Sequence, residues 1–306
     1  METILTALVS ELRRLKSVGV KTVNLSPTAL DSLRRALTQV RASKRALPGS
    51  DEPATAAAPE TAGPERAVTV RVEVQKKPVG TLPEARPLPV PEGSKSERMA
   101  WLTKRVVDDE VCRCRVRPGK KLVVGVGDLN ARIFFCGEAP GAEEELVGEP
   151  FVGPAGQLLN RMIQAMGLQR SEVYIGNIMN WRPELPTDSG QEQVGNRPPS
   201  AEEMTYCLPF FRAQLEIVNP EVIVALGSTA AQGLFGVGSF KALGEIRGQW
   251  KLFGEKPVMV TYHPSYILRN ASNRSKRAIW EDLLKVMERI GIPISERQRK
   301  YFLEAK

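Results

Sequence analysis

Three loops of this chain hold side chains whose types and spacing could do chemistry on a bound ligand. They cover residues 137–151, 177–183 and 263–269, and each follows a short apolar run. The first opens on Gly-Glu-Ala-Pro-Gly, where glycine allows a ligand to approach the backbone closely. Such a turn is also common as an ordinary strand-to-helix connection, so the three loops have to be interpreted together.

The second and third loops each begin with a polar side chain. Asn177 offers a hydrogen-bond donor and an acceptor on adjacent atoms. That pair matches the imide edge of a uracil-like base, whose O4 accepts and whose N3–H donates, although an asparagine in a turn is the commoner case. His263 is the only histidine of the chain, and a lone histidine is usually structural. Because it follows an apolar run and precedes Pro264 and Ser265, it is placed to donate a hydrogen bond to charge developing on a leaving group.

An aromatic side chain, Phe151, lies in the first loop between Pro150 and Val152. The surrounding loop has little apolar pattern that this ring could join. We therefore interpret the ring as a platform on which a flat ligand stacks.

Alternating strand and helix patterns position the three loops. Short apolar runs predict buried strands over 132–136, 173–178, 221–226 and 257–262. Helical spacing of apolar residues predicts helices over 155–166, 201–217 and 277–290 and from residue 228 onward. Strands separated by helices predict a three-layer α/β fold with a central, mostly parallel sheet of four to five strands. Ligands of such sheets bind beyond the carboxyl ends of the strands, where the three loops lie.

Composition divides the chain into four parts. Residues 1–47 carry leucines at helical spacing and a net charge of +6, which predicts a basic helical hairpin. Residues 48–97 contain nine prolines, which predicts a disordered linker. The α/β domain is expected over 98–295, and residues 296–306 are interpreted as a C-terminal tail.

Charge and hydropathy restrict the class of protein. The net charge is +8, which suits a polyanionic partner but is a weak sign of nucleic-acid binding on its own. No apolar run is long enough to span a membrane, so no membrane partner is expected. With no secretory signal pattern at its start and only four cysteines, the chain is expected in the cytoplasm, associated with the nucleoid.

Taken in order, the three loops resemble the uracil-DNA glycosylase superfamily, and family 4 most closely. The resemblance covers roughly residues 110–295. The resembling segments are residues 137–141, 150–156, 174–177, 196–199, 247–248 and 263–266. Several spaced motifs agree, which makes the resemblance specific.

The resemblance implies a monofunctional enzyme that flips uracil out of DNA and hydrolyses its N-glycosidic bond, which leaves an abasic site. It implies that Phe151 stacks on the base and that Asn177 reads its O4/N3 edge. His263 would stabilise the charge that grows on O2. Glu138, or alternatively Glu144, would orient the attacking water.

The same resemblance implies contacts with the base and with single- or double-stranded DNA. The base pocket would be completed by the segment Gly137, Glu138, Ala139, Pro140 and Gly141, together with Glu144. The DNA contacts would come from Ser265, Tyr266, Leu268, Arg269 and Arg247. No lysine lies in the motif loops to form a Schiff base, so hydrolysis without strand cleavage is expected.

The chain departs from the family at its cysteines. Family 4 enzymes usually hold a [4Fe–4S] cluster with four cysteines, the first two spaced Cys-x-x-Cys. Here Cys112 and Cys114 are one residue too close, and Trp181 stands at the third position. Cys207 is a plausible fourth ligand. Because a cluster needs four thiolates, no cofactor and no metal are expected; Cys112, Cys114 and Cys207 would be ligands only if a cluster survives.

Two other classes of function stay open. The runner-up is a DNA-lesion-binding or partner-recruiting module that keeps the pocket without efficient catalysis. A small-ester or nucleotide hydrolase is weakly supported, because neither a Gly-x-Ser-x-Gly elbow nor a phosphate-binding Gly-rich loop is present. The basic hairpin at 1–47 could bind DNA or a protein partner.

Overall fold

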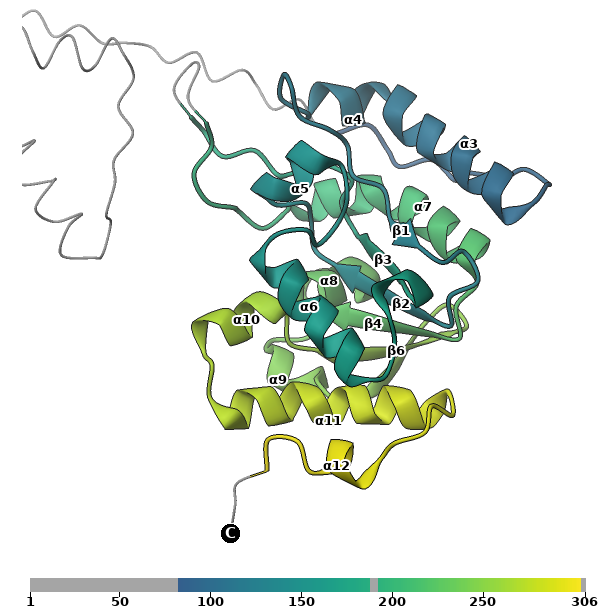
Figure 1. Cartoon of the computed structure of the whole chain (residues 1–306). Coiled ribbons are helices and arrows are strands. Elements are labelled where there is room, and N and C mark those ends of the chain that lie inside the picture. The colour runs from purple at the N-terminus through teal and green to yellow at the C-terminus, as the bar shows by residue number, and fades with distance from the viewer. Residues whose placement is uncertain (1–81, 188–191, 304–306) are drawn as a thin grey trace, which may run out of the picture. The chain divides into compact units, whose positions relative to one another are not determined.

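The computed structural model of the chain describes residues 82–187 and 192–303 (Figure 1). The hairpin expected at 1–47 and the first part of the expected linker lie outside the described residues. Within the described ranges, no helix combines the length and the apolar character that crossing a bilayer requires.

A six-stranded sheet forms the centre of the fold, with strand order β1-β3-β2-β4-β6-β5. The strands are β1 (Val126–Gly127), β2 (Ile133–Gly137), β3 (Tyr174–Asn177), β4 (Val222–Leu226), β5 (Trp250–Phe253) and β6 (Lys256–Thr261). The inner four are parallel, whereas β1 and β5 pair antiparallel at the edges. The predicted three-layer, mostly parallel fold is confirmed, and the sheet has two more strands than the four apolar runs indicated.

The two extra strands carry no clear apolar pattern. β1 is two residues long, and in β5 the side chains of Lys251 and Leu252 are exposed. An edge strand that faces solvent needs neither a continuous apolar run nor strict alternation, so sequence periodicity did not reveal either of them.

Helices cover both faces of the sheet (Figure 1). One face packs against α3 (Lys95–Asp108), α7 (Ala201–Val218) and α8 (Ser228–Phe235), and the other against α6 (Pro154–Ala165) and α11 (Asn273–Arg289). The shorter helices are α4 (Glu110–Cys114), α5 (Ala142–Val147), the 3₁₀ turn η1 (Arg170–Glu172), α9 (Leu243–Ile246), α10 (Pro264–Arg269) and α12 (Glu296–Arg299).

Each inner strand is apolar on both faces, as β2 illustrates. Phe134 and Cys136 belong to the core under α7, while Ile133 and Phe135 belong to the core under α6 and α11. A strand buried on both sides reads as a continuous apolar run, which explains why the inner strands could be predicted.

The register of the parallel strands brings their carboxyl ends level. Gly137 of β2 pairs with Asn177 of β3, and Leu226 of β4 pairs with Thr261 of β6. The residues that follow these four strands therefore meet at one edge of the sheet.

Two domain boundaries differ from the expectation. The helix α3 already begins at Lys95, and Leu88 and Val90 pack against the core, so residues 82–97 are not a disordered linker. At the other end, the expected tail folds back onto the domain. The Trp280 Nε1–H donates to the Gln298 carbonyl oxygen (2.6 Å), and the Gln298 Nε2 donates to the Ala165 carbonyl oxygen (2.8 Å).

Candidate active site

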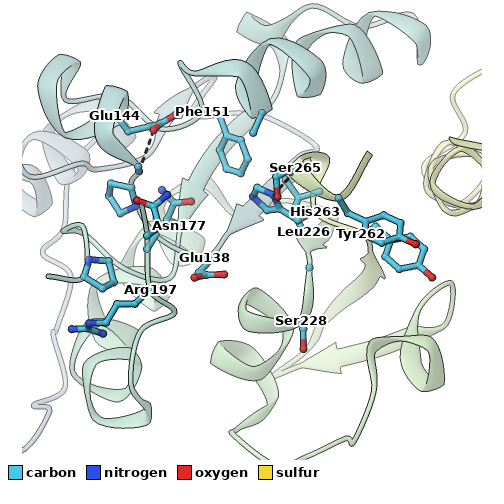
Figure 2. Close-up of a pocket in the computed structure, with 18 of the residues that line it drawn as sticks. Glu138, Glu144, Phe151, Asn177, Arg197, Leu226, Ser228, Tyr262, His263 and Ser265 are labelled. Atoms are coloured by element: carbon cyan, nitrogen blue, oxygen red, sulfur yellow. Dashed lines mark hydrogen bonds between the residues drawn. The ribbon is translucent and has the colours of Figure 1, made fainter. Parts of the chain in front are cut away.

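A cavity of about 530 Å³ lies beyond the carboxyl ends of the four parallel strands (Figure 2). Residues that follow each of these strands line it: Glu138 after β2, Asn177 at the end of β3, Ser228 after β4 and His263 after β6. The other lining residues are Ala139, Pro140, Gly141, Glu144, Phe151, Ala155, Pro183, Asn196, Arg197, Leu226, Gly227, Leu243, Tyr262, Ser265, Tyr266 and Arg269.

Phe151 enters this cavity from an unusual backbone conformation. Its φ is 54°, in the left-handed region that residues other than glycine rarely adopt, and the residue is 6% exposed. Gly137 permits this position, because a Cβ there would lie 2.5 Å from the Phe151 ring and 2.3 Å from Asn177 Oδ1. Gly137 thus does not line the cavity but lets the ring and the amide come together.

Side chains on both sides of Phe151 hold the loop in that conformation. Arg170 donates to the Pro150 carbonyl oxygen at 2.6 Å. Glu144 Oε1 accepts the backbone N–H groups of Val152 and Gly153, each at 3.0 Å, and its Oε2 accepts that of Gly141 at 3.1 Å. Both oxygens of Glu144 are therefore occupied in fixing the two loops, which leaves Glu138 as the better candidate to orient water.

Replacing Glu144 with alanine should loosen both loops. Three hydrogen bonds to a carboxylate are lost, each worth about 1.5–3 kcal/mol, so we expect a lower Tm and a raised KM for substrate. Thermal melting and steady-state kinetics would measure the two effects. The exposed neighbour provides the control: Glu143→Ala should change neither, and equal effects of the two substitutions would contradict this role.

Asn177 lines the cavity, and its amide oxygen has no hydrogen-bond partner among the residues that the structure describes. The residue is 5% exposed, and this Oδ1 atom is buried. A buried polar atom without a partner costs about 1–3 kcal/mol, so such an atom on a cavity-lining residue is a candidate acceptor for a donor group of a ligand. The structure places this side chain close to Phe151, and both residues line the same cavity.

His263 caps the short helix α10, and this fixes its imidazole. The Ser265 backbone N–H donates to His263 Nδ1 at 3.1 Å, and the Ser265 Oγ lies 2.8 Å from the same atom (Figure 2). A nitrogen that accepts a hydrogen bond carries no proton, so the neutral ring carries its proton on Nε2. The ring also lies near that of Phe151, with centroids 5.6 Å apart and planes 30° apart.

Burial lowers the pKa of His263 to about 4, and the positive charge of Arg269 acts in the same direction. The imidazole is therefore neutral at pH 7. A neutral ring with its proton on Nε2 can still donate one hydrogen bond through that N–H group.

Glu138 projects into the same cavity (Figure 2). Burial raises its pKa above the ordinary value, and a hydrogen bond from Thr229 partly offsets the shift. A carboxylate with a raised pKa is a stronger base, which fits a group that activates water.

The residues predicted to contact DNA separate into two groups. Ser265, Tyr266 and Arg269 line the cavity, while Leu268 on the same helix is 48% exposed and lies outside it. Arg247 does not line the cavity. Its guanidinium donates to the carboxylate of Asp282 (2.8 Å) and to a backbone carbonyl oxygen, so it is bound within the protein.

The lining contributed by β4 and by the end of β6 was not predicted from the sequence. Leu226 is the last residue of β4, Ser228 is the first residue of α8, and Tyr262 directly precedes His263. The rule that ligands lie beyond the carboxyl ends of parallel strands could have found all three. Arg197 also reaches the cavity edge, where it forms a bidentate ion pair with Glu203 (2.7 and 2.8 Å).

The sequence profile of the uracil DNA glycosylase superfamily matches residues 124–284, more than half of the chain. The chain belongs to this superfamily. The matched range contains the four parallel strands and every residue that lines the cavity.

The similarity to curated uracil-DNA glycosylases extends over most of the length of each relative. A type-4 uracil-DNA glycosylase of Thermotoga maritima is 42% identical over 187 residues, 59% of this chain and 91% of the relative. A type-4 enzyme of Saccharolobus solfataricus is 36% identical over 197 residues, 61% of this chain and 86% of the relative. A type-5 uracil-DNA glycosylase of Pyrobaculum aerophilum is 30% identical over 173 residues, 53% and 72% of the two chains.

The cysteines of this uracil-DNA glycosylase superfamily member do not fit a four-thiolate cluster. Cys112 and Cys207 are buried, Cys114 is exposed, and Cys136 lies within strand β2. Within the described part of the chain, no group of three or more His, Cys, Asp or Glu side chains is placed to hold a metal ion. Trp181 is 1% exposed and packs near Tyr206, with ring centroids 6.3 Å apart. Its indole belongs to the same core cluster as Cys112 and Cys207.

Proposed function

We propose that this chain excises uracil from DNA by hydrolysing the N-glycosidic bond, as the names of its type-4 relatives indicate for those proteins. The observation that carries the proposal is that a side chain with an unpaired amide oxygen and a neutral imidazole line the same cavity. Among the described residues Asn177 Oδ1 has no donor, and His263 carries its available proton on Nε2. Uracil supplies the complement: an N3–H donor flanked by O4 and O2 acceptors.

Recognition requires the base to leave the DNA stack, because the bond that breaks lies inside it. In the cavity the flipped base stacks on Phe151. Asn177 Oδ1 accepts its N3–H, and the amide nitrogen of Asn177 donates to O4. A cytosine presents an acceptor at N3 and a donor at C4, which reverses both hydrogen bonds and leaves polar atoms unpaired.

Catalysis rests on stabilising uracil as a leaving group. As the bond between C1′ and N1 lengthens, negative charge grows on O2, and the Nε2–H of His263 donates to it. A preorganised donor of this kind contributes about 2.7–4 kcal/mol to lowering the barrier. Glu138 accepts a proton from the water that adds to C1′, and the displaced electron pair stays on uracil.

The product is an abasic site in an intact strand. Among the described residues that line the cavity there is no lysine, so the sugar is not trapped as a Schiff base. Ser265 and Arg269 line the cavity on the side of α10, where they are placed to contact phosphates of single- or double-stranded DNA, and the exposed Leu268 is placed to fill the gap left by the base. A purely DNA-binding module is not favoured, because it would need neither a neutral histidine nor a buried carboxylate.

The test is direct detection of the released base. An oligonucleotide with one uracil is incubated with the protein, and free uracil is quantified by mass spectrometry beside matched thymine and cytosine oligonucleotides. Release from the uracil oligonucleotide alone is expected. Binding of all three without release of any base would favour the DNA-binding module.

The pH dependence of excision follows from the two pKa shifts. With the pKa of His263 near 4, the ring is neutral from pH 6 to 8, so we expect no loss of rate as the pH rises through 6.5. At lower pH the rate falls as Glu138 is protonated. Because its pKa is raised, this loss begins at a higher pH than for an ordinary glutamate. Single-turnover rates across this range would show it. A rate that declines with an apparent pKa near 6.5 on raising the pH would mean that the imidazolium is the active form.

The same shift affects stability at low pH. The unfolded chain protonates His263 near pH 6.5, whereas the native protein does so only near pH 4. The unfolded state therefore binds the extra proton between these values, and the free energy of unfolding falls as the pH is lowered through that window.

The proposed enzyme works without an iron–sulfur cluster, because its cysteines do not supply four thiolates. We expect purified protein to be colourless, with no stoichiometric iron or sulfide, and chelators to leave uracil release unchanged. Trp181→Ala should instead cost about 3–5 kcal/mol of unfolding free energy, because a large buried side chain is lost. Stoichiometric iron in the active protein would contradict the expectation that the enzyme works without a cluster.

Residues 1–47 carry a net charge of +6, which favours binding to a polyanion such as DNA. They tether the enzyme to DNA or to a partner protein and keep it at the nucleoid. Deleting residues 1–81 should leave excision on short oligonucleotides intact and reduce retention on long DNA. Unchanged retention would remove this role.

A further inference from the structure

Two stacked tyrosines line the same cavity on the side of α10. The rings of Tyr262 and Tyr266 have centroids 4.4 Å apart and planes 15° apart, which is face-to-face stacking. Tyr262 directly precedes His263 in the sequence, and Tyr266 lies within α10. The proposed mechanism of uracil excision uses neither ring.

A cation that is itself bound within the protein contacts the Tyr262 ring. The Arg247 guanidinium lies over the Tyr262 ring, with Cζ 5.4 Å from its centroid. Arg247 is itself held by Asp282 (2.8 Å), whose same oxygen accepts the Thr261 hydroxyl at 2.6 Å. The Tyr262 ring therefore contacts both the Arg247 guanidinium and the Tyr266 ring before substrate arrives. This preorganisation lowers the entropic cost of stacking a further flat group.

Tyr266 belongs to α10, the helix that we propose contacts DNA. Tyr266 shares α10 with Ser265 and Arg269, which line the same cavity, and with Leu268, which is exposed. Once a nucleotide has entered the cavity, the next base in the strand lies within one nucleotide of the cavity mouth. That base has lost the stacking partner that was flipped out, so an aromatic ring there can replace the lost contact.

We propose that Tyr266, backed by Tyr262 and Arg247, stacks on the base adjacent to the flipped uridine. This inference rests on the proposed function and adds a second base-binding position to it. Stacking on an aromatic ring accepts any of the four bases, because each has a π face. The site therefore requires a neighbouring base but does not select among the four bases. Arg247 takes the role of a positioning residue for the stack instead of the DNA contact predicted from the sequence.

Removing the neighbouring base from the substrate tests this stack directly. Single-stranded oligonucleotides carry one uracil and either normal neighbours or a tetrahydrofuran abasic analogue on its 5′ or 3′ side. For the wild type, omission of the base on one of the two sides should lower kcat/KM about tenfold, the size of one base–aromatic stack. The kcat/KM of Tyr266→Leu should be about tenfold lower than that of the wild type on the normal substrate. Omission of the neighbouring base should not lower it further.

Two variants separate stacking from support of the fold. Tyr266→Phe keeps the ring and should keep the dependence on the neighbouring base. Tyr301→Leu removes a tyrosine that packs on Trp280 (centroids 5.2 Å apart) outside the cavity, so it should lower only the Tm. If Tyr266→Leu lowers kcat/KM by the same factor on all three substrates, Tyr266 acts only as a wall of the cavity and the proposal is wrong.

Failure of the proposed function and failure of this stack give different results. If the wild type releases no uracil from the normal oligonucleotide, the proposed function fails at that point. Stacking is then measured by fluorescence anisotropy with oligonucleotides that carry an abasic analogue at the central position, with and without the adjacent base. Weaker binding on omission of that base in the wild type, but not in Tyr266→Leu, would still support the stack, and its absence would overturn it.

Discussion

Replacing His263 with alanine is expected to lower the single-turnover rate of uracil excision by about 10²–10³-fold, the loss seen when one preorganised donor is removed. The reason is geometric and electrostatic together. The Nδ1 of His263 is occupied by the Ser265 N–H at 3.1 Å, so the Nε2–H is the donor available to uracil O2. Rates are measured with enzyme in excess, so that binding and product release do not obscure the chemical step.

The control for this substitution preserves the ring and changes its support. Ser265→Ala removes the hydroxyl 2.8 Å from Nδ1 but keeps the backbone N–H bond, so it should cost much less than His263→Ala. If His263→Ala retains the wild-type rate with an unchanged Tm, the leaving group is stabilised by another residue, and the catalytic role proposed for His263 is wrong.

Replacing Asn177 with alanine is expected to lower kcat/KM for uracil by about 10²-fold or more while leaving the Tm unchanged or raised. Uracil would lose both partners of its O4/N3–H edge inside a desolvated cavity, at about 1–3 kcal/mol for each unpaired group. In the free protein, by contrast, the substitution removes a buried oxygen that has no partner. A residue that costs stability and carries function gives this opposite response of rate and Tm.

Asn180→Ala is the matched control for this second prediction. Asn180 is a buried asparagine in the same segment that does not line the cavity, and its Oδ1 also has no partner among the described residues. Its Nδ2, however, donates to the Val123 carbonyl oxygen at 3.1 Å. Its loss should lower the Tm and change excision little. A lower Tm for Asn177→Ala with an unchanged rate would reassign Asn177 to a structural role.

The inner part of the fold could be predicted because burial on both faces leaves a strong pattern in the sequence. The strands that carry Glu138, Asn177 and His263 at their ends are continuous apolar runs, and the strand-end rule then places the loops at one edge. These three residues and Phe151 do line one cavity. The charge and composition of the chain contributed little to that outcome.

Features that depend on tertiary contacts could not be read from the sequence. Nothing local distinguishes Glu144, which binds three backbone N–H groups, from the exposed Glu143 beside it. The ion pair between Arg247 and Asp282, which lie 35 residues apart along the chain, could not be read from the sequence either. The edge strand β5 and the packing of residues 296–303 likewise depend on neighbours that are remote in sequence.

Excision of uracil by the cavity bounded by Phe151, Asn177 and His263 should leave an intact, abasic strand. The most direct measurement uses a labelled oligonucleotide with one uracil, incubated with wild type, Asn177→Ala or His263→Ala, then split between hot alkali and no treatment. We predict a strand break at the uracil position only after alkali, strong for the wild type and nearly absent for both variants. Breakage without alkali, or equal breakage by all three proteins, would contradict the proposed function of this cavity.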